Sequence, residues 1–335
     1  MHDELDLLRA ADPAPPGDGP WRDRPLPAHA ERELNRLLFS TRTKRARRRL
    51  VLRAEAAVLA LGAVLAFTFS GAGAARAVAM PVALAPHAGA PALPLAELAR
   101  RAQDRARTAG PTDGPHRGSH VQSWNLSMQP GPGPVPPVTA PEERMTRWRA
   151  DGSGSELVVA TDPRHPGRPV IDGTGGRWHA VHGGKVLHRR TYPALPTGRR
   201  DLAARTAPPA DPQALRRRLA ARYGGTGGGT PHLLTALSSL LQQWTLGPRE
   251  AAAVVRVLAD ADGLRPVGTV RDRLGRRGQA YVYDGPDGGM DATRQMVILD
   301  PRTGRLMGTE TTFTRDLPGF RITSGEVLSY EVWLP

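Results

Sequence analysis

The amino-acid sequence predicts an α+β fold: one transmembrane helix, then an outer domain in which an antiparallel sheet carries a helical insertion packed on one side. Three observations predict it. A run of twenty uncharged residues, 56–75, is long enough to span a bilayer. Beyond it, short segments of alternating polarity come in pairs around Gly-containing turns, which is typical of antiparallel strands. A block of helical segments then separates the earlier strands from the later ones, an order that favours α+β.

The membrane segment is predicted to run from Leu50 to Ala75, and its flanks predict its orientation. Seven cations with no acid among them lie between Arg42 and Arg53, at its N-terminal end, whereas Arg76 alone carries charge in the first residues after it. By the positive-inside rule the N-terminus then stays in the cytoplasm and the rest of the chain is extracytoplasmic, at the plasma membrane. The topology determinants are Arg42, Lys44, Arg45, Arg47, Arg48, Arg49 and Arg53.

Two alternatives stay open for this segment. Ala77-Val78-Ala79 would suit a signal peptidase, so the segment could be a cleaved export signal. The long leader before the apolar run favours an uncleaved signal-anchor instead. A buried helix of a soluble domain fits less well, because 56–69 has no polar face.

Residues 1–49 form a short, mostly irregular cytoplasmic arm. A helical run over 28–40 places Leu34, Leu37 and Leu38 on one face. We interpret it first as a helix on the membrane or continuing into the anchor, and second as a docking helix for a cytosolic partner. The basic cluster is a topology signal first and an anionic-lipid contact second. Nucleic acid is not expected as a partner, since no helix-turn-helix spacing accompanies the cluster.

The outer region begins with an Ala/Pro/Gly-rich stalk, 76–117, that contains one helical stretch over 95–110. An extracytoplasmic α+β domain, 118–335, follows. Strands are predicted over the ranges 120–128, 143–150, 156–161, 177–181, 185–189, 267–273, 278–283, 295–299, 305–313 and 325–334. Helices are predicted over 211–223, 233–246 and 248–261, where Asp211-Pro212 and Gly247-Pro248 mark helix starts. The pairs around Gly152 and Gly183 are predicted to be hairpins.

Composition limits the chemistry. The 335 residues include no cysteine, which excludes disulfides, thiolate metal sites and a catalytic Cys. The formal net charge is +14, but of 46 basic residues only Lys44 and Lys185 are lysines. That bias is what a GC-rich genome would impose, so it weakens any argument from charge to nucleic acid.

No catalytic, cofactor or phosphate-binding motif is found, and we expect neither an enzyme nor a cofactor. The glycine tract 224–229 follows a helix, so a connector is favoured over a phosphate cradle. His179, His182 and His188 are the best metal candidates, with surface histidines as the plainer alternative. Four acids suggest calcium, although loop solvation explains them as well because their spacing lacks the calcium-loop register. They are Asp284, Asp287, Asp291 and Asp300.

Four tryptophans fall on predicted strands. Core packing is the first explanation for them, and lining of an apolar groove is the second. They are Trp124, Trp148, Trp178 and Trp333.

Several stretches resemble a group of uncharacterised actinobacterial single-pass membrane proteins. The most specific are DRLGRRGQAYVYD followed by ILDPRTGRLMG, supported by DELDLLRA, WRADGSG, LPT, DPQALRRRL and LLTALSSLLQQWTLGPREAAAVVRVLA. Members look like partners of extracytoplasmic-function sigma factors. Their outer domains look distantly similar to LolA-like lipoprotein carriers and to periplasmic stress sensors, whose curved sheet cradles acyl chains. The arm here lacks the His/Cys zinc motif of the usual anti-sigma pattern.

These observations lead to three functional hypotheses. The first is a non-enzymatic, membrane-anchored extracytoplasmic sensor or regulatory protein, with a sigma-factor-related protein as its implied partner. The second is an anchored carrier that binds lipid or another hydrophobic ligand in a curved-sheet groove. The third is an envelope hydrolase with an unrecognised site, which the empty motif search disfavours.

Overall fold

The computed structural model describes residues 81–87, 89, 91–110, 113–127, 138–139, 141–162, 167–173, 178–194, 206–223, 229–285, 293–318 and 322–334. All of them belong to the second of two compact units, Leu59–Pro335. The predicted arm (1–49), the membrane segment (50–75) and the seven topology determinants lie outside the described residues. Within the described ranges, no helix is both long and apolar enough to cross a membrane.

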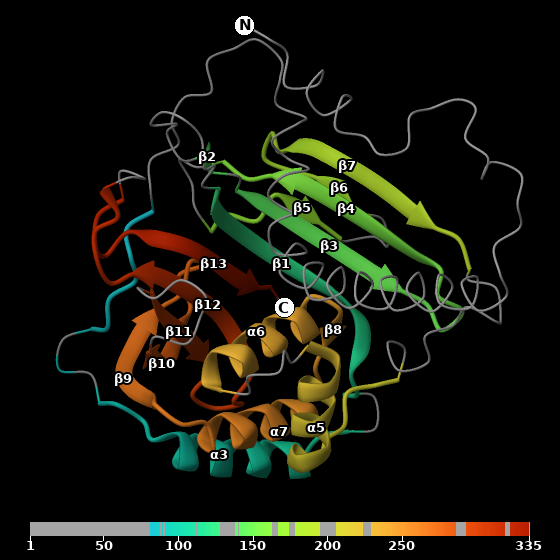
Figure 1. Ribbon diagram of the computed structural model, residues 1–335. Coiled ribbons are helices and arrows are strands. Elements are labelled where there is room, and N and C mark those ends of the chain that lie inside the picture. Colours follow the sequence, from blue (N-terminus) through green and yellow to red (C-terminus); the bar gives the residue numbers. More distant parts are fainter. Residues whose placement is uncertain are drawn as a thin grey trace, which may run out of the picture. The chain divides into compact units, whose positions relative to one another are not determined.

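The predicted α+β class is confirmed for the outer region, where an antiparallel sheet packs against helices (Figure 1). Each helix overlaps a predicted one, but the predicted helix 233–246 is wrong at its end, because Trp244–Thr245 pair with His116–Arg117 as a short strand. The helices of the described residues are α3 (Leu95–Arg107), α5 (Pro212–Tyr223), α6 (Thr230–Leu241) and α7 (Pro248–Ala259). Proline in the first turns of α6 and α7 explains their starts, since a proline there removes no helical hydrogen bond.

One large sheet contains most of the strands, in the spatial order β7-β4-β3-β1-β13-β12-β11-β10-β9, with β2 and β8 pairing to β1. Its longer strands are β1 (His116–Ser127), β3 (Glu142–Trp148), β4 (Gly154–Ala160), β7 (Lys185–Tyr192), β9 (Leu264–Arg271), β10 (Arg277–Asp284), β11 (Thr293–Leu299), β12 (Leu306–Phe313) and β13 (Val327–Trp333). Short strands are β2 (Val138–Thr139) and β8 (Trp244–Thr245), and a separate pair is β5 (Ile171–Asp172) with β6 (His179–Ala180).

Alternate residues of each strand point to opposite faces of the sheet. We name the two faces by what covers them. On the helix face, Val121, Val297 and Trp333 join one core with α3, α5, α6 and α7. On the strap face, Trp124 and Met296 point the other way and help to form two further apolar clusters.

The strap, residues 81–87, is the segment that gives the strap face its name. It precedes α3 and is drawn in blue in Figure 1. Its Ala83 and Leu84 pack against the two apolar clusters of this face. The backbone N–H of His87 donates to the Thr269 carbonyl on the edge strand β9 at 2.9 Å. The strap therefore reaches the outer edge of the sheet before the chain turns into α3.

The predicted stalk is thus part of the folded unit where it is described. Leu98 and Ala102 of α3 are fully buried in the helix-face core. The Tyr281 hydroxyl donates to the Leu93 carbonyl at 2.8 Å, which fixes the entry to α3 on β10. Burying one leucine side chain stabilises a fold by about 1.5–3 kcal/mol. The folded domain therefore begins well before Gly118, because the apolar side of α3 needs the core.

A small hairpin, β5–β6, covers β3 and β4 on the strap face. Its pairing differs from the one that the sequence predicts. The sequence predicts a hairpin between 177–181 and 185–189, but β6 pairs with β5 and β7 pairs with β4. A Cβ at Gly184 would lie 2.6 Å from Val159, so glycine lets the chain cross closely from one layer to the other.

Glu143 fastens this hairpin to the sheet. Its carboxylate is fully buried and accepts hydrogen bonds from His120 and Gln122, and from the backbone N–H groups of Val170 and Ile171. Burial alone would raise the pKa of Glu143, but these hydrogen bonds hold it below its ordinary value. The ionised carboxylate is therefore part of the fold.

We expect Glu143→Gln to destabilise the protein by about 1–3 kcal/mol, because an amide NH₂ would then face donors inside the sheet. Because the folded pKa is lowered, this loss is present above pH 4.5 and shrinks as the pH falls through the folded value. Thermal unfolding across pH measures it. Hydrogen exchange should speed up at the Val170 and Ile171 amides.

Glu326→Gln is the matched control, since that carboxylate accepts one exposed amide, from Thr323. Equal losses in the two variants would contradict the role assigned to Glu143.

Candidate functional site

A cavity lies on the strap face, between the strap and strands β9–β12. Its volume is about 310 Å³, which is at the lower end for small-molecule sites, about 300–1,000 Å³. We call it the strap groove. It is lined by Ala83, Leu84, Pro86, Arg265, Val267, Val282, Arg294, Met296, Glu310, Thr312, Phe313, Thr314, Ser324 and Gly325.

The floor of the strap groove is apolar because of strand register. Met296 pairs with Val282 on one side and with Glu310 on the other, so all three point to the strap face. Val282 and Met296 are buried, and Phe313 closes one end at 1% exposure. A ligand in this groove would therefore meet aliphatic and aromatic carbon beneath it.

Glu310 holds the strap from below. Its carboxylate accepts the Leu84 backbone N–H at 2.7 Å and pairs with Arg273. The Arg273 guanidinium also lies 5.0 Å from the centre of the Tyr330 ring, and Tyr330 stacks on Trp124. Burial raises the pKa of Glu310, and Arg273 opposes that rise only in part. This fastening is weaker than that of Glu143, because one backbone N–H replaces two.

Two arginines stand at the rim of the strap groove. Arg265 of β9 and Arg294 of β11 flank Asp284 of β10, and both donate to its carboxylate, Arg294 at 2.5 Å. Both side chains remain about half exposed. Burial would raise the pKa of Asp284, but the two arginines hold it below its ordinary range. The rim therefore keeps a guanidinium pair in place with donors left over.

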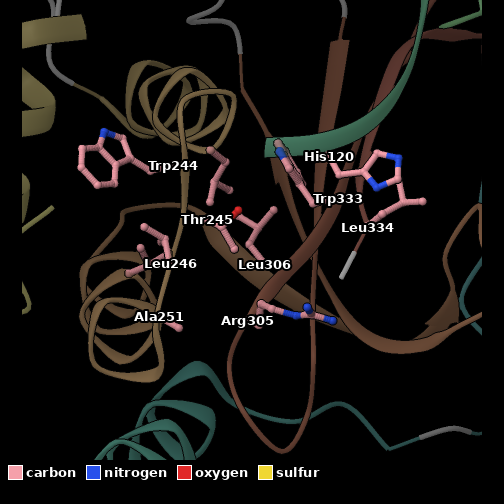
Figure 2. A pocket seen from close by; sticks show the side chains of 11 residues that line it. His120, Trp244, Thr245, Leu246, Ala251, Arg305, Leu306, Trp333 and Leu334 are labelled. Carbon is pink, nitrogen blue, oxygen red and sulfur yellow. The ribbon is translucent and has the colours of Figure 1, made fainter. Parts of the chain in front are cut away.

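A second, much smaller cavity lies on the helix face, between β13 and the β8–α7 connection. Its volume is about 40 Å³. Figure 2 shows Trp333 and Leu306 from the sheet opposite Thr245 and Leu246. Trp333 is only 7% exposed. The helix face is therefore packed, with no room for a lipid chain at this cavity.

The four tryptophans do not line one groove. Trp124 is buried against Tyr330 on the strap face, and Trp333 is buried on the helix face. Trp148 lies beside Tyr192, with ring centres 4.8 Å apart, and beneath Arg117. Trp178 belongs to the β5–β6 hairpin and lies under Arg147. Core and surface packing account for all four.

The metal candidates have separate partners. His182 contacts Arg168 at 2.8 Å, His179 lies 3.9 Å from Asp172, and His188 contacts Glu156. Among the described residues no group of three or more potential ligands converges.

The calcium candidates are likewise divided. Asp284 binds arginines, and Asp300 accepts the backbone N–H groups of Arg302 and Thr303 in a turn. The stretch 286–292, with Asp287 and Asp291, lies outside the described residues, as does 224–228 of the glycine tract.

A polar cluster that the sequence did not reveal lies on the helix face of β3, β4 and β7. Glu156 accepts a hydrogen bond from the Tyr192 hydroxyl at 2.7 Å, contacts His188 and lies 3.5 Å from Arg144. Burial would raise the pKa of Glu156, but these neighbours hold it below its ordinary value. Its contacts are all between strands of the same sheet, so we interpret the cluster as a structural network.

Comparisons with protein-family models, with curated proteins and with solved structures found no match. The strap groove is therefore the best-supported site on geometry alone. Sequence reasoning missed its residues because Leu84 and Glu310 meet across 226 positions of chain. The one available signal was that Val282 and Met296 lie in near-continuous apolar stretches, AYVY and MVIL, which are typical of strands with two apolar faces.

We expect Leu84→Asp to release the strap while the domain stays folded. The new carboxylate would lie beside Glu310 in apolar surroundings, and like charges in such a place repel. Hydrogen exchange at the His87 amide, which bonds to β9, should increase at least about tenfold. The midpoint of thermal unfolding should fall far less than in a core variant such as Leu98→Ala.

Val82→Asp is the matched control, because that neighbouring side chain is 84% exposed. Protection of His87 that persists in Leu84→Asp would argue against the described fastening.

Proposed function

We propose that this protein is a non-enzymatic, membrane-anchored extracytoplasmic sensor whose strap groove binds the signal. The observation that carries the proposal is the position of the strap. It closes one side of a ligand-sized cavity, and it follows shortly after the predicted membrane segment, 50–75. Occupancy of the groove would change the position of the strap. The strap in turn lies close in sequence to the predicted anchor.

The fastenings of the strap support this proposal. The polar contacts described between residues 81–87 and the sheet are those of Leu84 with Glu310 and of His87 with Thr269. Segments with few buried contacts are the ones that open at low free energy and serve as switches. A ligand that binds the released strap differently from the fastened one shifts this equilibrium.

An anchored carrier of a hydrophobic ligand is the second candidate, favoured by the apolar floor of the same groove. The two proposals differ in what the cytoplasmic arm does. A sensor needs residues 1–49 to engage a partner, for which the family resemblance implies a sigma-factor-related regulatory protein. A carrier needs only retention at the membrane.

The proposed topology is testable because the chain has no native cysteine. We expect a membrane-impermeant maleimide to label Val82→Cys in intact cells, since that side chain is exposed. Ser40→Cys, in the predicted arm, should be labelled only after the membrane is broken. Labelling of position 40 in intact cells would refute the orientation.

The sensor role predicts that deletion of residues 1–41, which keeps the basic cluster that orients the anchor, abolishes a transcriptional response to envelope stress. Leu84→Asp, which frees the strap, should instead make the response constitutive. Val82→Asp should leave it unchanged. A response that survives the deletion would contradict the sensor proposal, and the carrier proposal would remain.

A further inference from the structure

We propose that the strap groove takes a long-chain carboxylate: one unbranched apolar chain under the strap, with its single negative charge at Arg265 and Arg294. This assignment rests on the proposed ligand-binding role of the groove and names its ligand class. It differs from the sequence-based expectation of a tryptophan-lined groove, since the strap groove lies on the sheet face opposite the helices.

The charges around the groove favour a monoanion. Among the described residues at the rim, two arginines, Arg265 and Arg294, share one carboxylate, Asp284. This local pair of cations favours one further negative charge. A carboxylate supplies it, whereas a phosphate monoester carries about −1.5 to −2 and would overcompensate.

The two rim arginines have the geometry for a second carboxylate. They lie on strands that flank β10 and point to the same face, since Arg294 pairs with Asp284 and Arg265 pairs with Val282. A guanidinium has five N–H donors and binds carboxylates with two parallel hydrogen bonds. The contact of Arg294 with Asp284 is made by its Nε atom, and its outer nitrogens are further donors of the same guanidinium.

The rest of the groove fits a chain and not a bulky head. Apart from the two rim arginines and Glu310, the residues that line it are uncharged. Val267, Val282 and Met296 form the floor. The Glu310 carboxylate is already satisfied by Leu84 and Arg273. Thr312, Thr314 and Ser324 also line the groove, and Thr312 pairs with Arg294 of the rim. A ligand with one polar end therefore matches the groove in one orientation.

Photoaffinity labelling of the full-length protein in native membranes tests this assignment. The probe is a long-chain fatty acid with a diazirine in its chain, and the comparison probe is the fatty alcohol of the same length. We expect the acid to label peptides that contain residues 81–86, 294–298 or 310–314. The alcohol should label them about tenfold less, because it loses the charge-assisted hydrogen bonds.

Two sets of variants assign the ends of the ligand. Met296→Trp fills the floor and should reduce labelling by both probes. Arg265→Gln with Arg294→Gln should reduce labelling by the acid about tenfold and leave the alcohol unchanged. The matched control is Arg271→Gln with Arg277→Gln, which removes two exposed arginines from the other ends of β9 and β10.

Both arginines of the rim are about half exposed, so the variant that lacks them should fold. Measurement of its thermal unfolding checks this. Equal labelling by acid and alcohol overturns the assignment. Unchanged labelling by the acid in the Arg265→Gln, Arg294→Gln variant overturns it as well. A phosphate-headed lysolipid that displaces the acid at equal concentration does so as well. If the acid labels the groove but the arm-deleted protein still signals, the ligand assignment stands and the sensor proposal fails.

Discussion

Strands β10, β11 and β12 place apolar side chains on both faces of the sheet, so both faces have to be covered. Tyr281 and Val297 point to the helices, whereas Val282 and Met296 point to the other side. Each face left in water would cost about 25 cal/mol per Å² of apolar surface. Four helices cover one face over these strands. On the other face the cover consists of shorter pieces, the strap and the β5–β6 hairpin, and the strap groove is the part of that face which they leave open.

The strap face uses one buried carboxylate beneath each covering segment. Glu143 of β3 accepts two backbone N–H groups of the hairpin, and Glu310 of β12 accepts one from the strap. A segment without regular secondary structure needs partners for its buried amides, and a carboxylate supplies several acceptor sites at once. The hairpin is therefore fastened to its carboxylate by two backbone hydrogen bonds, and the strap by one.

This difference links the fold to the proposed function. A cover that is easily released, and that leads toward a predicted anchor, can report on what lies beneath it. The helix face offers no such arrangement, because its remaining cavity is about 40 Å³ and Trp333 is packed. The rim arginines add polarity to an otherwise apolar groove, which gives a bound amphiphile one orientation.

The sequence by itself determined the longer elements and their order, but not the short strands β2, β5 and β8. Pro212 and Pro248 stand in the first turns of two helices, and the Asp151-Gly152 turn joins two alternating segments into a hairpin. These signals are local, since each depends on residues a few positions apart.

Only the tertiary structure decided what covers each face. The strap docks on Glu310, β6 pairs with β5 instead of β7, and α3 belongs to the core. Each of these depends on contacts between residues far apart in the chain, and on which of the two apolar faces a segment packs against. A continuous apolar run shows that both faces of a strand are apolar, but it holds no information about which distant segment will bury them.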